Sequence, residues 1–309
     1  MKLLPFLLIL ASLSFGQTAK EYFQQAQIYA NDGNYKIAID KLNNAIQIDA
    51  TNPNYYDLLV DCYFESGAYQ ESFDMCGVGI YLFPETSIFY NKRAGILFEF
   101  YEIEDAILDY DKAIEYAEDD EYLSIYYSNR GGAKSKIGNH QGAYEDLLNS
   151  YALDSTNLGV LNNLGIVSDE LGYDEESLKH LFKALELAPN YFPTYINIGF
   201  KYQEKGEHEK AIEYFDKALE LSPNQAYAFS NRSYNKYKLG NLKGAMKDIE
   251  ISIKLDFRNS YAYKNRALIY IAQKKYKKAC EDIQLALDHG FTKSYGEEVL
   301  ELQKKYCKD

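Results

Sequence analysis

Asparagine recurs in this chain at a constant interval of 34 residues, at Asn129, Asn163, Asn197, Asn231 and Asn265. The asparagine amide can donate a hydrogen bond to a peptide carbonyl and accept one from a peptide N–H. Amides repeated at one interval along a surface could therefore hold an extended polypeptide by its main chain, without reading its side chains. The same amides could instead bond to a neighbouring helix, and the spacing leaves both interpretations open.

The interval belongs to a repeating unit, because other residue types return with the same period. With Asn129 as the sixth residue of its unit, the sequence divides into eight units: Ala19–Asn52, Pro53–Thr86, Ser87–Asp120, Ser124–Asn157, Leu158–Tyr191, Phe192–Gln225, Ala226–Asn259 and Ser260–Lys293. Residues 121–123 are an insertion between the third and fourth units, which separates residues 19–120 from residues 124–293. We therefore expect a stack of similar supersecondary units rather than one globular core.

Small residues and turn residues occupy fixed places in the unit. The eighth, twentieth and twenty-seventh places hold alanine, serine or glycine, apart from Val60, and such residues let two helices approach closely. The fifteenth place is glycine in six units and is Tyr101 or Lys274 in the other two. Glycine at this place predicts a tight turn after a helix. Each unit is therefore predicted to be a helix, a turn and a second helix.

These features resemble the tetratricopeptide repeat, whose pattern has the same small residues, a turn glycine and a proline near its end. The best match is Phe192–Gln225, with Gly199, Gly206, Ala211 and Pro223 at the expected places. The resemblance implies an all-α fold, a right-handed superhelical solenoid of antiparallel helix pairs. The remaining segment, Ser294–Asp309, is predicted to be a C-terminal capping helix with a polar outer face.

In this family the first helices of the units line a concave surface, so the resemblance implies a groove on that side. Besides the five asparagines, the places that face it hold Asp57, Asp61, Asp169, Phe200 and Tyr234. We predict an inner face that is acidic toward the N-terminus and aromatic toward the C-terminus. The asparagine row resembles that in the repeat arm of eukaryotic O-linked sugar transferases, which grips protein segments by their main chain. The implied partner is a protein or an extended peptide.

A second pattern joins the two predicted helices of a unit. Arginine at the seventh place and aspartate at the twenty-third occur together in four units, and neither occurs at these places in the others. A partly buried arginine needs a countercharge, so we predict four ion pairs inside units. They are Arg93 with Asp109, Arg130 with Asp146, Arg232 with Asp248, and Arg266 with Asp282.

The first residues, Met1–Gly16, have the pattern of a secretory signal. Lys2 precedes a mostly apolar run, Leu3–Phe15, and Ser14 and Gly16 are small residues before a cleavage site. The run is short for a membrane span. We expect a bacterial protein that is exported, to the periplasm or out of the cell, without an integral membrane segment after cleavage. An uncleaved membrane tether is the alternative.

Export would permit disulfides. Cys280 and Cys307 are expected at similar levels on neighbouring helices, where they could form a disulfide that closes the end of the stack or remain buried thiols. Cys62 and Cys76 are less well matched in height, so we expect buried free thiols there.

Charge is distributed unevenly along the chain. The net charge is −13, yet residues 226–309 hold 17 basic and 10 acidic residues, a net of +7 that leaves −20 for residues 1–225. Nucleic-acid binding is not expected, because phosphate contacts need a basic face. Lys274, Lys275 and Lys277, with Lys278, could contact anionic lipid or an acidic partner, or could simply form a solvated helix face.

No catalytic, metal or cofactor site is predicted. The four histidines lie in four different units, and no cysteine, histidine or glycine spacing fits zinc, a nucleophile or a phosphate loop. We therefore expect a non-catalytic scaffold that binds a protein or extended peptide in its groove. The alternatives are a subunit of an envelope assembly or secretion complex, and a module that binds glycan or peptidoglycan fragments. The sequence does not indicate an oligomeric state.

Overall fold

The structure is a computed structural model that describes residues 17–307, with the backbone alone for residues 294 and 295. The predicted signal segment, Met1–Gly16, therefore lies outside the described residues. The same holds for residues 308–309, the end of the predicted capping segment.

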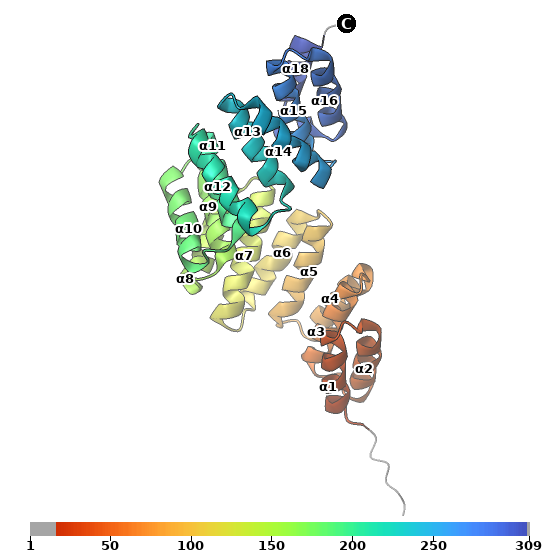
Figure 1. The fold of residues 1–309 in the computed structure, drawn as a ribbon. Coiled ribbons are helices and arrows are strands. Elements are labelled where there is room, and N and C mark those ends of the chain that lie inside the picture. Colours follow the sequence, from red (N-terminus) through yellow and green to blue (C-terminus); the bar gives the residue numbers. More distant parts are fainter. Residues whose placement is uncertain (1–16, 308–309) are drawn as a thin grey trace, which may run out of the picture. The chain divides into compact units, whose positions relative to one another are not determined.

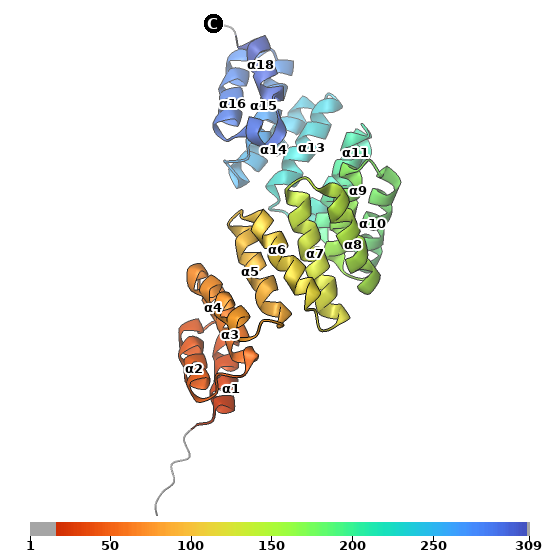
Figure 2. The same cartoon turned by 180° about the vertical axis from the view of Figure 1, so that it is seen from behind.

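The described chain forms two compact bodies, and each is built of α-helices that short turns connect (Figures 1 and 2). The N-terminal body ends at Leu153 and holds α1 (Ala19–Asn31), α2 (Tyr35–Ile48), α3 (Pro53–Glu65), α4 (Tyr69–Leu82), α5 (Ser87–Glu99), α6 (Ile103–Glu115), α7 (Asp120–Lys136) and α8 (His140–Leu153). The C-terminal body begins at Asp154 and holds α9 (Leu158–Glu170), α10 (Asp174–Leu187), α11 (Phe192–Glu204), α12 (His208–Leu221), α13 (Ala226–Lys238), α14 (Leu242–Leu255), α15 (Ser260–Ala272), α16 (Tyr276–Asp288), α17 (Phe291–Tyr295) and α18 (Glu298–Tyr306). Helices α1 to α16 pack as consecutive pairs, which confirms the predicted all-α arrangement.

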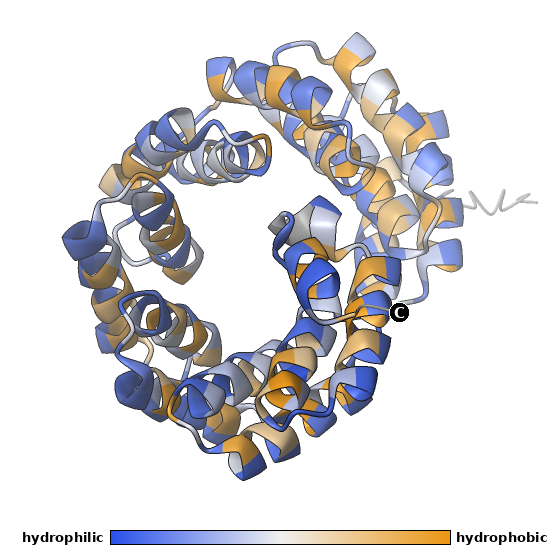
Figure 3. Ribbon diagram, turned by 90° about the horizontal axis from the view of Figure 1, so that it is seen from above, coloured by the Kyte–Doolittle hydropathy of each residue, from blue (hydrophilic) through white to orange (hydrophobic). Residues whose placement is uncertain are grey.

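Each helix carries hydrophobic and hydrophilic residues along its length (Figure 3). The hydrophobic ones pack between the two helices of a pair and against the next pair. The three small places of the first unit show this clearly, because Ala26, Ala38 and Ala45 are completely buried.

Glycine at the eighth place marks the closest approach inside a pair. A Cβ atom added to Gly165 would lie 2.6 Å from Leu181 of the facing helix, and one added to Gly199 would lie 2.9 Å from Phe215. The twenty-seventh place does the same between pairs, because a Cβ on Gly79 would lie 2.5 Å from Phe89 of the next unit. These places are small because a large neighbouring side chain already fills the space.

Tyrosine at the fourth place joins consecutive units. Its hydroxyl donates to a backbone carbonyl six residues earlier, in the connection from the previous unit. The bonds are 2.8–3.2 Å long, from Tyr56 to Ala50, from Tyr90 to Pro84, from Tyr195 to Pro189, and from Tyr263 to Phe257. This place needs an apolar ring with a hydroxyl at its tip, which contributes to the high tyrosine content.

The predicted insertion, residues 121–123, extends a helix instead of forming a separate loop. These residues make the first turn of α7, which has 17 residues where the other first helices have 13. Asp119 caps this turn, because its side chain accepts a 2.9 Å hydrogen bond from the Tyr122 N–H.

Within the predicted capping segment, Ser294–Asp309, the helix that covers the last pair is shorter than predicted. The backbone adopts a positive φ of 84° at Gly296, which a continuing helix does not allow. Two helices therefore form, α17 and α18, and the first begins inside the predicted eighth unit. Helix α18 packs on α16, with Val299 completely buried, so this shorter helix covers the end of the last pair.

The turn inside each of the eight units places its fifteenth residue in the left-handed region. The φ angle lies between 72° and 81° at the six glycines, and it is 65° at Tyr101 and 60° at Lys274. A side chain in this conformation crowds the following carbonyl, at a cost of roughly 1–2 kcal/mol. The turns at Tyr101 and Lys274 are therefore strained.

Replacing either residue by glycine should stabilise the fold. For Tyr101→Gly and for Lys274→Gly we expect the free energy of unfolding to rise by about 1 kcal/mol, because relief of strain exceeds the added flexibility of the unfolded chain. Urea unfolding followed by circular dichroism measures this change. The control is Gly206→Ala, at a turn with φ of 72°, which should lower stability instead. Destabilisation by both glycine variants would contradict the strain.

Candidate functional site

All four arginine–aspartate pairs of the sequence are in contact in the structure. Each arginine uses two nitrogens to donate to both oxygens of the aspartate sixteen residues later, at 2.6–2.8 Å; the pairs are Arg93–Asp109, Arg130–Asp146, Arg232–Asp248 and Arg266–Asp282. The aspartate side chains are nearly buried, with 3–10% of their surface exposed. The pairs connect the two helices of one unit, so their role is structural.

Two of these pairs, Arg130–Asp146 and Arg232–Asp248, belong to larger charge clusters. Arg232 also reaches Asp216 at 2.6 Å, and Lys236 donates to Asp248 at 2.8 Å. Burial alone would lower the pKa of Arg232, but its hydrogen bonds to Asp248 raise the pKa above its ordinary value. The guanidinium therefore stays charged throughout the physiological pH range.

The predicted asparagine row has a different role at different positions. Asn129 Nδ2 donates to Asn91 Oδ1 at 2.9 Å, and Asn197 Nδ2 donates to Asn162 Oδ1 at 3.1 Å. In both cases the sixth residue of a unit bonds to the fifth residue of the preceding unit. These two amides thus join neighbouring first helices, as the alternative interpretation of the sequence proposed.

Asn265 is the clearest departure from the prediction. Its side chain is 1% exposed and donates to the Ser230 hydroxyl at 3.2 Å and to the Ser230 carbonyl at 3.3 Å. Ser230 is again the fifth residue of the preceding unit. Asn265 lies in the packing between α13 and α15, so its assignment to a ligand-facing row is wrong.

Two amides of the row, those of Asn163 and Asn231, remain available, and for Asn231 the sequence shows why. The fifth place of the preceding unit is Ile196, which offers no polar side chain. Within residues 17–307, the Asn231 side chain makes no hydrogen bond, although it is half-buried. Asn163, on α9, is also half-buried and makes no side-chain hydrogen bond within this range.

Two aspartates of the predicted acidic face near the N-terminus share one lysine as their counterion. Lys92, the sixth residue of its unit, forms an ion pair with Asp57 and a second one with Asp61 at 2.6 Å. Burial raises the pKa of Asp61, while the Lys92 ammonium opposes this rise. Asp57 and Asp61 therefore stabilise the contact between α3 and α5, and they offer less free charge than the sequence indicates.

Asp169 is likewise engaged by a buried lysine. Lys201 is 5% exposed, pairs with Asp169, and reaches Asp174 at 2.6 Å. Burial lowers the pKa of Lys201 from its ordinary value, although Glu204 opposes the shift. Lys201 is the tenth residue of its unit, and its two aspartates are the twelfth and seventeenth residues of the preceding unit.

The same three places hold a network of amide and imidazole side chains one unit later. The completely buried Asn235 donates from Nδ2 to Gln203 Oε1 at 2.7 Å, and its Oδ1 lies 2.8 Å from Nδ1 of His208. Sequence reasoning missed these contacts, although residues ten, twelve and seventeen carry complementary polar groups in both cases. The two clusters hold consecutive units together through buried polar contacts.

A cavity lies on the first helices of the C-terminal body. It measures about 190 Å³ and is lined by four of the predicted site residues, Asp169, Asn197, Phe200 and Asn231. Phe200 exposes 40% of its surface. Tyr234 does not line this cavity; its half-buried ring has Lys264 Nζ 5.3 Å from its centre.

The N-terminal body has a cavity of about 340 Å³ on its own first helices. Its lining includes Asp61, Asn91, Lys92, Phe98 and Asn129. The polar groups here already bond to one another, since Lys92 contacts Asp61 and Asn129 contacts Asn91. This site is therefore satisfied internally, whereas the site at Asn231 is not.

The family model of the tetratricopeptide repeat matches residues 192–225, the unit formed by α11 and α12. Helix pairs with the same spacing precede and follow this unit along the described chain. The chain is a tetratricopeptide repeat protein. No curated protein sequence matches it significantly.

Several solved structures are similar to this tetratricopeptide repeat protein. The APC/C hetero-tetramer Cut9–Hcn1 matches with a TM-score of 0.67 and 16% identity, over 91% of this chain and 55% of that one, so this chain spans about half of it. The Pseudomonas aeruginosa pilF structure matches with a TM-score of 0.60 and 15% identity, over 68% and 94%. A tetratricopeptide repeat protein from Parabacteroides merdae matches with a TM-score of 0.50 and 19% identity, over 94% and 100%. At these identities the likeness shows the shared fold alone.

The cysteines of the tetratricopeptide repeat protein have two different states. Cys280 on α16 and Cys307 after α18 form a disulfide, with an S–S distance of 2.01 Å. Cys62 and Cys76 are free and buried, and burial raises the pKa of Cys62 to about 11 and that of Cys76 to about 12. The disulfide connects the terminal helix to the last repeat.

No cluster of histidine, cysteine and carboxylate side chains within residues 17–307 could hold a metal ion. None of the helices there is both long and apolar enough to span a membrane.

The ion pairs should contribute strongly to the stability of the tetratricopeptide repeat protein. For Arg232→Ala we expect the free energy of unfolding to fall by about 2–4 kcal/mol, because Asp248 would remain buried without its main countercharge. Urea unfolding measures the change. The matched control is Arg258→Ala, because Arg258 is exposed and its loss should change stability by at most about 0.5 kcal/mol. A loss below about 0.5 kcal/mol for Arg232→Ala would show that the pair is not effectively buried.

Proposed function

We propose that this tetratricopeptide repeat protein binds an extended segment of another protein on the first helices of its C-terminal body. Such repeat proteins are generally non-catalytic scaffolds for protein–protein interaction. The proposal goes further by assigning the binding to the cavity between α9 and α11, which Asn231 of α13 also lines.

The observation that carries the proposal is the unpaired amide of Asn231. The equivalent amides of Asn129 and Asn197 are used by a polar residue of the preceding helix, and Ile196 removes that partner for Asn231. An amide that is half-buried and unpaired can offer a donor and an acceptor together. The N–H and C=O groups of an extended main chain complement this pair of groups.

Other residues of the cavity favour a particular class of segment. Phe200 presents an exposed aromatic ring beside Asn197, which suits an apolar side chain of the ligand. Glu170 adds an exposed carboxylate, while the charge of Asp169 is compensated by Lys201. We therefore expect a segment with an apolar side chain and without acidic residues at this position.

Site-specific photo-crosslinking can identify the segment. A photoreactive phenylalanine analogue at Phe200 should crosslink to one defined segment of a protein in a cell-envelope extract. The same analogue at Tyr81, an exposed residue of the second helix α4, is the control and should not capture that segment. The segment, prepared as a synthetic peptide, then serves as the probe for affinity measurements.

Asn231→Ala should weaken binding of this peptide about tenfold, the loss expected for hydrogen bonds worth about 1.4 kcal/mol. Its melting temperature should stay unchanged, because the amide has no partner inside the protein. Fluorescence anisotropy and thermal unfolding measure the two quantities. The control is Asn224→Ala in an exposed connection, which should change neither. Unchanged affinity with a lowered melting temperature would contradict the proposal.

The two other hypotheses from the sequence give different results in these experiments. A subunit of an envelope assembly or secretion complex would crosslink through its outer helices or charged ends, and its binding would survive Asn231→Ala. A glycan-binding module would bind purified sugar fragments directly, and Phe200 would capture no polypeptide.

We also propose that the protein is exported, to the periplasm or out of the cell. Support comes from the signal pattern of Met1–Gly16 and from the disulfide between Cys280 and Cys307, since disulfides persist in oxidising compartments. Protein taken from the producing cells without reductant should show two alkylatable thiols after denaturation and four after reduction. In the native state at pH 8 alkylation should be slow, because burial raises the pKa of both free thiols. Four thiols before reduction would contradict the oxidised state and hence its support for export.

A further inference from the structure

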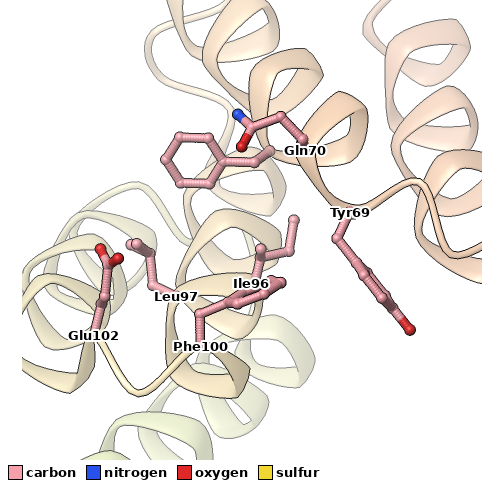
Figure 4. A pocket seen from close by; sticks show the side chains of 7 residues that line it. Tyr69, Gln70, Ile96, Leu97, Phe100 and Glu102 are labelled. Atoms are coloured by element: carbon pink, nitrogen blue, oxygen red, sulfur yellow. The ribbon is translucent and has the colours of Figure 1, made fainter.

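The largest cavity described for the N-terminal body shares only Ile96 with the lining of the cavity described above. It measures about 580 Å³ and lies between α4 and the end of α5 (Figure 4). Its lining is mostly apolar and aromatic: Tyr69, Gln70, Phe73, Ile96, Leu97, Phe100 and Glu102. Figure 4 shows Tyr69 and Gln70 on one helix, with Ile96 and Leu97 on the next.

Aromatic side chains form an exposed rim at this cavity. The rings of Tyr69 and Phe100 are in edge contact, with centroids 6.0 Å apart, and both residues are exposed. Tyr101 follows directly and exposes 77% of its surface. A continuous group of exposed aromatic residues beside a cavity is typical of a surface that another molecule covers.

The surroundings of the cavity are acidic. Residues 53–120 hold 16 acidic and 3 basic residues, a net charge of −13. The three basic residues are already paired: Lys92 with Asp57 and Asp61, Arg93 with Asp109, and Lys112 with Glu115. From the neighbouring α7, Lys136 Nζ lies 5.7 Å from the ring centre of Tyr101. Glu99, Glu102, Glu104 and Asp105 are all exposed near the aromatic rim. A basic partner with an aromatic or apolar side chain would complement this surface.

The C-terminal body carries a turn with that composition. Four exposed lysines flank Tyr276 at the start of α16: Lys274, Lys275, Lys277 and Lys278. None of the four forms an ion pair with a carboxylate in the part of the chain that the structure describes. Tyr276 is 45% exposed, and its other side stacks on Tyr306 of the terminal helix.

The turn at Tyr101, beside the cavity, shares a backbone feature with the turn at Lys274, which carries the four lysines and is called the basic turn below. Tyr101 and Lys274 are the two fifteenth-place residues that are not glycine, and both adopt a positive φ. Glycine at these places would adopt the positive φ without strain, as it does in the other six turns. Side chains that are kept in a strained conformation point to a role outside folding.

We propose that the basic turn of one molecule docks on the acidic aromatic surface of a second copy of this chain. This surface consists of Tyr69, Phe100 and Tyr101 with the carboxylates of Glu99, Glu102, Glu104 and Asp105. The lysine ammonium groups face the carboxylates and the aromatic rings of Phe100 and Tyr101, and Tyr276 packs at the edge of the cavity. Charge complementarity favours this occupant, because the same chain carries both surfaces. Among the described residues, none of the exposed carboxylates near the rim and none of the four lysines forms an ion pair. The contact is head-to-tail, so each molecule can engage two neighbours.

Sedimentation velocity on the full chain tests the proposal. The weight-average sedimentation coefficient should rise with protein concentration at low ionic strength, and the rise should diminish at high salt. The double variant Lys275→Glu/Lys277→Glu and the double variant Glu102→Lys/Asp105→Lys should each weaken association at least tenfold. An equimolar mixture of the two variants should associate again, because the unchanged basic turn of the second variant can dock on the unchanged acidic surface of the first.

Two further variants separate docking from general effects of charge and folding. Lys243→Glu/Lys247→Glu changes the net charge equally at exposed lysines of α14 and should associate as the unchanged protein does. Tyr101→Gly should weaken association several-fold while folding stability rises, so a loss of binding cannot be attributed to unfolding.

Three results would overturn the proposal. The first is a sedimentation coefficient that does not depend on concentration. The second is association that survives both charge reversals. The third is a monomer that binds phosphatidylglycerol vesicles through Lys275 and Lys277, which would assign the basic turn to lipid. None of these results depends on peptide binding at Asn231, so the two proposals can fail separately.

Discussion

The close approach of paired helices is the constraint on which the rest of this structure depends. At Gly165 and Gly199 there is no room for a Cβ atom, because Leu181 and Phe215 of the facing helix already fill the space. Gly79 meets Phe89 in the same way across the boundary between two units. These contacts determine how far apart the helices lie, and hence which polar side chains can reach one another. The bidentate arginine–aspartate pairs form at that separation.

Polar groups on the first helices either hold the stack together or remain free for binding, and for four of the five asparagines the fifth residue of the preceding unit accounts for the difference. The amides of Asn129 and Asn197 bond to asparagines of the preceding unit, and that of Asn265 bonds to Ser230. The corresponding residue for Asn231 is Ile196, which has no polar side chain. A hydrogen bond made inside the stack removes that amide from ligand binding. A repeated residue therefore does not imply a repeated function, because each copy is completed by a different neighbour.

Much of the fold could be predicted from the sequence, because the 34-residue period and the small residues are local signals. The partners of Arg93 and Arg130 could also be predicted, since arginine and aspartate occur in the same units. Whether each polar side chain of the predicted ligand-facing row is already bonded inside the stack could not be predicted from its own place in the unit. It depends on pairs such as Lys92 with Asp57, and Lys201 with Asp169, which join different places in successive units. The break at Gly296 was missed because the apolar pattern of the last segment continues past it.

The bonds between the fifth and sixth places have an implication for how such a chain can change during evolution. Duplicating or exchanging a single repeat would set its sixth residue against an unfamiliar fifth residue. A second copy of the unit beginning at Ala226, for instance, would place its own sixth-place asparagine beside Ser230, so the amide of the copy would be occupied while that of the original stayed open. Recombination can thus create or abolish a ligand contact without altering any codon inside the repeat. The ligand contacts that such a chain can make therefore depend on the order of its repeats as well as on the sequence of each repeat.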